Sequence, residues 1–169
     1  MTAKNKFKAT VIRWLCNHGF PNVDIGFKED FGYAIDNYTN MINIGVEANP
    51  EVGKYFEQFL YEFGLEYVGI PLPVLVFFHE LGHHMTLSSF SSDELWLCSF
   101  AKNWSHGEID QEWYFNYWNT MDEFAANAWE IDYINSHIEA VEEFCNMIII
   151  AWSELCQEVN PFSLIKEDN

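Results

Sequence analysis

Two histidines four residues apart, with a glutamate directly after the first, constrain this chain more than any other feature. They are His79 and His83, and Glu80 completes the run His-Glu-Leu-Gly-His. Residues i and i+4 lie on one face of an α-helix, so both imidazoles can reach one metal ion while Glu80 addresses a water molecule in the remaining coordination position. The run therefore predicts a helix that carries two zinc ligands and a general base.

The neighbouring residues favour a helix at this place. Pro71 and Pro73 stand where a helix can begin, and the apolar residues 74–78 lead into the motif. We therefore expect residues 73–87 to be helical. The alternative is a chance match, in which both histidines only hydrogen-bond to their neighbours.

A third protein ligand is required, because catalytic zinc usually holds three side chains and one open position. The candidate is Glu123, which shares one face of a predicted helix, residues 120–136, with Asn127 and Glu130. Asn127 could fix the tautomer of a liganding histidine, or it could be an ordinary exposed polar residue. Thr120 and Glu123 also match a capping box, in which Glu123 would fold back onto a backbone N–H.

The two motifs together resemble a known group of enzymes. The run His-Glu-Leu-Gly-His, followed by E-x-x-A-N-x-W from position 123, is similar to the gluzincin zinc peptidases, and most closely to the small ImmA/IrrE-type peptidases of phages and mobile elements. The resemblance covers both motif helices and the preceding sheet. It implies that His79, His83 and Glu123 bind Zn2+, that Glu80 activates the water, and that the substrate is an intracellular protein such as a repressor.

The chain departs from the family's pattern at the end of the second motif. Trp129 stands where the family usually has phenylalanine, and Glu130 replaces the alanine that follows. The separation between His83 and Glu123 is also longer than is usual in this family.

Peptide hydrolysis at such a centre needs no nucleophilic side chain. The metal polarises the substrate carbonyl, and Glu80 takes a proton from water and passes it to the leaving amine. A further donor should stabilise the oxyanion. His84, His106, Tyr114 and Tyr117 are candidates, and the spacing does not choose among them.

Composition limits the partners. The chain has 169 residues, which suits a single zincin-like metallopeptidase domain over residues 1–169. It carries 26 acidic and 8 basic residues, a formal net charge of -18, so we expect no direct nucleic-acid binding. A basic peptide substrate, a basic protein partner or mimicry of DNA toward a DNA-binding protein would suit this charge, and so would simple solubility.

Cysteine usage and hydropathy indicate the compartment. The four cysteines show no C-x-x-C spacing and are expected to be reduced, and no signal peptide or membrane-spanning run is apparent. These observations predict a cytoplasmic protein without a membrane role, and the resemblance implies the cytoplasm of a bacterial or phage-infected cell.

Apolar periodicity and turn residues predict an α+β fold, with a small three-stranded antiparallel sheet packed on a mostly helical domain. The resemblance implies that this domain is zincin-like. In the peptidases that the chain resembles, the strand before the active helix lies at the edge of the cleft and pairs with extended substrate, so the resemblance implies that residues 41–46 could do the same at an exposed sheet edge. Ser91 and Glu94 match a capping box that opens a further helix. The predicted helices are residues 3–17, 49–64, 73–87, 92–100, 107–118, 120–136 and 139–159, and the predicted strands are residues 23–28, 32–36 and 41–46.

Two classes of function fit these observations. The first is a zinc-dependent peptidase that cuts an intracellular protein. The second is a catalytically silent binding protein of the same fold, whose acidic surface engages a basic or DNA-binding partner. A silent descendant has no physical need for Glu80, so the motif favours the peptidase.

Overall fold

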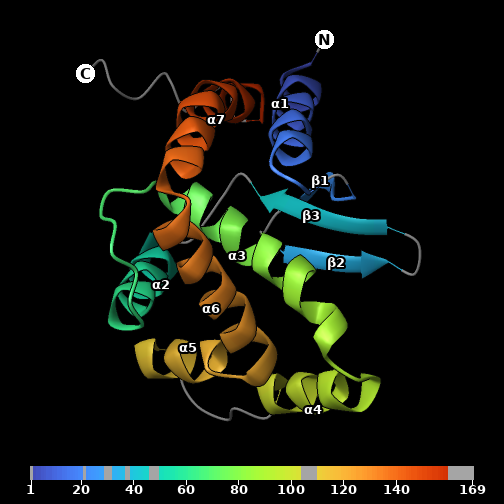
Figure 1. Cartoon of the computed structure of the whole chain (residues 1–169), viewed down its shortest axis with the longest axis vertical. Coiled ribbons are helices and arrows are strands. Elements are labelled where there is room, and N and C mark those ends of the chain that lie inside the picture. Colours follow the sequence, from blue (N-terminus) through green and yellow to red (C-terminus); the bar gives the residue numbers. More distant parts are fainter. Residues whose placement is uncertain are drawn as a thin grey trace. The chain divides into compact units, whose positions relative to one another are not determined.

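The computed structural model describes residues 2–20, 22–28, 32–36, 39–45, 50–103 and 110–159, and it is of the α+β class (Figure 1). Most predicted elements are present within a few residues of their expected bounds. Residues 46, 49, 107–109 and His106, on which parts of the predictions fell, lie outside the described residues. In chain order the elements are α1 (Ala3–Asn17), β1 (Asp24–Lys28), β2 (Gly32–Asp36), β3 (Thr39–Gly45), α2 (Pro50–Glu62), α3 (Leu72–Thr86), a 3-10 turn η1 (Leu87–Ser89), α4 (Ser92–Asn103), α5 (Gln111–Trp118), α6 (Met121–Ser136) and α7 (Ile138–Val159).

The chain groups into two compact units. One combines residues 1–47 and 139–169, which include α1, the sheet and α7, and the other consists of residues 48–138, which include α2 to α6. Each unit is described by itself. The single domain expected from the chain length stays a prediction.

The sheet of the first unit is mixed, with the strand order β1-β3-β2. β1 is parallel to β3, with Ile25 opposite Ile42, whereas β2 is antiparallel to β3, with Ala34 opposite Met41. The predicted antiparallel meander is therefore wrong. The central place of β3 pairs its backbone on both sides, and Ile42 and Ile44 are buried. The prediction of an exposed substrate-pairing edge at residues 41–46 is also wrong, because both edges of β3 already carry a strand.

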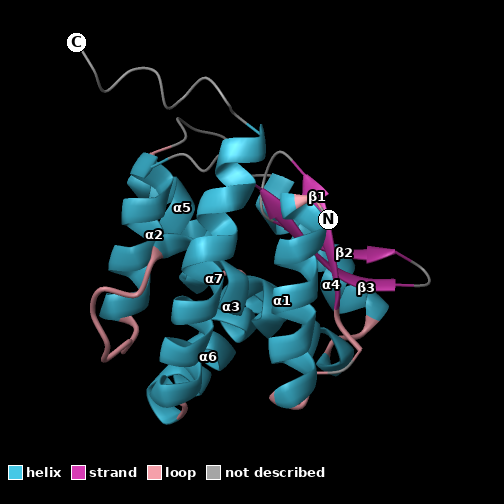
Figure 2. Cartoon of the chain, turned by 90° about the horizontal axis from the view of Figure 1, so that it is seen from above, coloured by secondary structure: helices cyan, strands magenta, loops and turns pink. Residues whose placement is uncertain are grey.

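Helices α1 and α7 of the first unit run antiparallel to each other (Figure 2). Near one end, Lys6 forms an ion pair with Glu154 at 2.7 Å. Further along α1, the ring of Trp14 lies 4.8 Å from that of Phe144. Both aromatic side chains are buried, so this contact forms part of the unit's apolar core.

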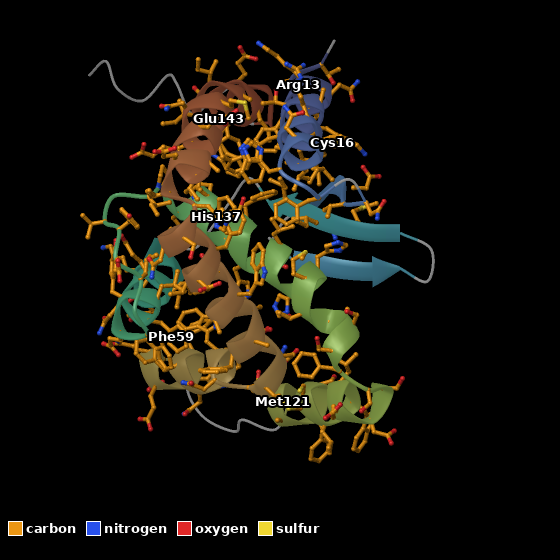
Figure 3. All side chains as sticks on the ribbon, viewed as in Figure 1. Arg13, Cys16, Phe59, Met121, His137 and Glu143 are labelled. Atoms are coloured by element: carbon orange, nitrogen blue, oxygen red, sulfur yellow. The ribbon has the colours of Figure 1, made fainter. Side chains whose placement is uncertain are left out.

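The second unit is built around the packing of α3 on α6. Phe59 of α2 is fully buried and packs on the rings of Phe115 and Trp118 from α5, with centroid distances of 5.4 Å in each case. Figure 3 shows Phe59 among the other side chains of this unit. This aromatic core supports the helices that carry both motifs.

Two further expectations concern cysteines and membrane spans. Cys16, Cys98 and Cys145 are free thiols. None of the described helices combines the length and apolar character that crossing a membrane requires.

Candidate metal centre

The His-Glu-Leu-Gly-His run lies on α3, as predicted. The helix begins after Pro71, and Val74, Leu75 and Phe78 are buried in the turns that precede the motif. A proline at the start suits a helix, since its missing N–H would have no partner there. The buried face of α3 then carries His79 into the interior of the unit, where the residue is 7 % exposed.

A glycine lets α6 approach this helix closely. A Cβ atom added at Gly82 would lie 2.5 Å from the carbonyl oxygen of Ala126, which is part of the α6 backbone. Such a separation is shorter than side-chain carbons accept, so only glycine fits here. This contact brings Glu123, one turn before Ala126, next to the histidines.

Three ligand atoms converge between the two helices. The Nε2 atoms of His79 and His83 are 3.1 Å apart, and Glu123 Oε2 lies 3.0 Å from the first and 3.3 Å from the second. Zinc at about 2.05 Å from each of its ligands in a tetrahedral site would space them by roughly 3.3 Å. The triangle therefore has the dimensions of three tetrahedral positions, and these residues fit a divalent metal ion.

The side chain of Glu123 belongs to this triangle and does not cap the N-terminus of α6. It is 3 % exposed, and the side chain of Thr120, the N-cap of α6, makes no capping hydrogen bond. The capping-box alternative for Glu123 is thus wrong. The box predicted at Ser91 is confirmed, because Glu94 Oε2 accepts hydrogen bonds of 2.7 Å from both the backbone N–H and the hydroxyl of Ser91.

Asn127 fixes the tautomer of His79. Its side-chain amide donates to the carbonyl oxygen of Trp118 at 3.2 Å, which leaves Oδ1 to accept from His79 Nδ1 at 2.7 Å. With the hydrogen on Nδ1, the lone pair of Nε2 points to the triangle. Asn127 is 2 % exposed, so the alternative of an exposed polar residue is wrong.

The electrostatics of the triangle favour a cation at its centre. Burial lowers the pKa of His79, but the hydrogen bond and charge of Glu123 outweigh it and raise this pKa to about 9. The pKa of Glu123 falls well below its usual range, because both histidines outweigh the opposing effect of burial. A carboxylate and two imidazole lone pairs at this spacing repel one another unless a proton or a metal ion lies between them.

Glu80 follows His79 on α3 and is 7 % exposed. Its charge contributes to the raised pKa of His79 and to that of Glu130. The predicted base therefore lies within electrostatic range of His79, one of the candidate metal ligands, and it is largely shielded from solvent.

Among the four candidates for the oxyanion donor, the structure brings Tyr117 to the site. Burial, followed by the charge of Glu123 and a hydrogen bond to it, raises the pKa of Tyr117 far above its usual range. Tyr114 instead stacks on Trp118, with centroids 5.4 Å apart. For His84, half-buried, only burial shifts the pKa, downward, and His106 lies outside the described residues.

Lys102 of α4 is a site residue that the sequence analysis missed. Its Nζ lies 2.6 Å from Glu123 Oε1 and 2.6 Å from Asp122 Oδ2. The charges and hydrogen bonds of these carboxylates outweigh burial and raise the pKa of Lys102, which stays a cation. The available signal was weak: Lys102 is a basic residue of a strongly acidic chain and lies between the two motifs.

The chain was compared with models of known protein families, with curated proteins and with solved structures, and it matches none of them.

Proposed function

We propose that this protein is a zinc-dependent peptidase of the gluzincin kind, similar to the ImmA/IrrE-type enzymes, which hydrolyses a peptide bond in an intracellular protein. The observation that carries the proposal is the triangle of His79 Nε2, His83 Nε2 and Glu123 Oε2, with sides of 3.0 to 3.3 Å, next to the buried Glu80. A group of ligands needs no neighbouring base for binding a metal, whereas peptide hydrolysis does.

The proposed roles follow from the positions of the side chains. His79, His83 and Glu123 would hold the ion, and Asn127 would keep His79 in the tautomer that binds through Nε2. A divalent ion held there would polarise the scissile carbonyl and lower the pKa of a water molecule toward neutrality. Glu80 would accept the proton of that water and deliver it to the leaving amine.

The substrate is inferred from charge. At a formal net charge of -18, the protein would attract basic segments of a partner and repel phosphate backbones. A basic protein is therefore a suitable substrate, and the resemblance suggests a repressor as one such protein.

The choice of zinc rests on the ligand types, because two imidazoles and one carboxylate are a common donor set for catalytic zinc.

Replacement of Glu80 by Gln tests the reaction. The variant should bind zinc like the wild type and should hydrolyse a basic model protein about 10²- to 10⁴-fold more slowly, because it lacks the general base. The matched control is Glu66→Gln, an exposed glutamate of the same unit, which should cleave at the wild-type rate.

The same variant separates the two classes of function. If Glu80→Gln lowers cleavage but leaves metal binding intact, the peptidase is supported. If the wild type cleaves no protein and Glu80→Gln retains the full biological effect, the protein acts instead by binding a basic or DNA-binding partner.

A further inference from the structure

A histidine or glutamate ligand has a second polar atom besides the one that binds the ion, and a hydrogen bond to this second atom fixes the orientation of the side chain. For His79, Asn127 holds this atom. For Glu123 it is Oε1, and Lys102 Nζ donates to it at 2.6 Å. The Lys102 side chain is 19 % exposed, so water competes little for this contact.

Two further contacts hold Lys102 in place. It donates to Asp122 Oδ2 at 2.6 Å, and its Nζ lies 5.0 Å from the centre of the Tyr117 ring. α4 packs against α6 near Met121, which begins α6 and is labelled in Figure 3. The ammonium group is thus fixed beside the first turn of α6, from which Glu123 projects.

This contact restricts how Glu123 can bind an ion. A carboxylate can ligate with one oxygen or with both, and in this arrangement a charged hydrogen bond occupies Oε1 while Oε2 faces both histidines. Lys102 cannot be a ligand itself, because an ammonium group has no lone pair. What it can do is hold the ligand's orientation.

We infer that Lys102 is a positioning residue that keeps Glu123 a single-oxygen ligand, so that α4 is a working part of the metal centre. The inference rests on the proposed function, since it concerns the same ion. The role of Lys102 would also explain the long separation between His83 and Glu123, because the intervening segment contains α4, the helix that supplies Lys102.

The test compares Lys102→Met with Lys102→Arg. Zinc affinity is measured by competition with a chromophoric chelator, and the visible spectrum of the cobalt(II) form reports the coordination number. Lys102→Met should bind zinc about 10- to 100-fold more weakly, the usual effect of losing an outer partner of a ligand. Its cobalt bands should weaken, because the freed Oε1 can join the ion and raise the coordination number. Lys102→Arg keeps the charge and should restore affinity and spectrum to nearly wild-type values.

Lys54→Met is the matched control, because it removes the same charge from an exposed position of the same unit. It should leave affinity and spectrum unchanged. If Lys102→Met does not fold, as judged by its thermal unfolding without metal, Lys102→Gln takes its place with the same expected losses.

The possible outcomes separate the role of Lys102 from the proposed function. If the wild type binds zinc and the folded Lys102→Met or Lys102→Gln variant binds it equally tightly with an unchanged cobalt spectrum, the role of Lys102 is wrong. A failure of Lys102→Arg to recover either property also overturns it. If the wild type itself binds no zinc, the proposed function fails instead.

Discussion

Glu130 is a buried carboxyl group beside the candidate site. It is completely buried, and neither of its carboxyl oxygens has a hydrogen-bond partner in the described part of the chain. Its Oε2 lies 4.0 Å from Nδ1 of His79. A carboxyl group in such surroundings favours its neutral form, because an unpaired buried charge is strongly destabilising.

Glu130→Gln should change how the stability of the metal-free protein depends on pH. Burial raises the pKa of Glu130 far above 4.5; His79 opposes this and Glu80 adds to it. The folded state therefore binds more protons than the unfolded state above about pH 4.5, so this group lowers stability as the pH rises. Urea unfolding should show that Glu130→Gln becomes more stable relative to the wild type by about 1–3 kcal/mol between pH 4.5 and pH 7. Parallel pH profiles for the two proteins would contradict this.

At the scale of residues, the helix repeat made it possible to predict from the sequence which side chains share one face of a helix. His79 and His83 share a helix face by their spacing, and so do Glu123 and Asn127. Lys102 could not be predicted in its role, because its contact with Glu123 depends on how α4 folds back onto α6. Local patterns contain no information on such long-range contacts.

At the scale of elements, the crossing of α3 and α6 decides the geometry of the centre. At Gly82 the two helices are so close that an added Cβ atom would lie 2.5 Å from the backbone oxygen of Ala126. A backbone neighbour cannot move aside as a side chain can, so an added methyl group must push the helices apart. The separation of Glu123 from the histidines would grow with it.

Gly82→Ala should therefore destabilise the protein by about 1–3 kcal/mol, although alanine alone favours a helix by about 1 kcal/mol. The zinc affinity of Gly82→Ala should also fall, because Glu123 would lie farther from the histidines. The matched control is Gly53→Ala in α2, where the nearest neighbours of the added carbon are atoms of the flexible Leu72 side chain. This variant should lose less stability and keep its affinity. Thermal unfolding and zinc titration check both variants, and equal behaviour would refute the role of Gly82.

Elements were predicted better than their pairing. Helix bounds follow local signals, such as Pro71 before α3 and the Ser91–Glu94 box before α4. Strand order depends on contacts between distant residues, and the alternation of β1 suits a parallel partner as well as an antiparallel one. For this reason the mixed sheet, with β3 in its centre, was not predicted.

At the scale of the whole molecule, charge is the dominant property. At a formal net charge of -18, the acidic side chains repel one another more strongly in the compact folded state than in the unfolded chain. Added salt screens this repulsion, since the Debye length falls from about 30 Å at 0.01 M to about 8 Å at 0.15 M.

The melting temperature should consequently rise by about 2–4 °C over this range of sodium chloride at pH 7, equivalent to roughly 1 kcal/mol. At pH 5, closer to the pI of 4.4, the same addition should have a smaller effect. Differential scanning calorimetry measures both. A melting temperature that falls with salt at pH 7 would contradict the role of self-repulsion.

The division of the chain into two units was not evident from the sequence, since no linker or change in composition separates them. The first unit joins α1 and the sheet with α7, and no local pattern indicates that residues so far apart belong together. The α+β class, by contrast, followed from counting helical and strand patterns.

The most direct test of the account is the zinc affinity of Glu123→Ala beside that of the wild type, measured by equilibrium competition with a chelator. The wild type should bind one ion per chain. Glu123→Ala should bind it more weakly by more than the roughly 100-fold that an outer partner contributes, while Glu66→Ala, at an exposed position, should bind like the wild type. Undiminished zinc affinity in Glu123→Ala would show that Glu123 is not the third ligand, and it would contradict the proposed metal centre.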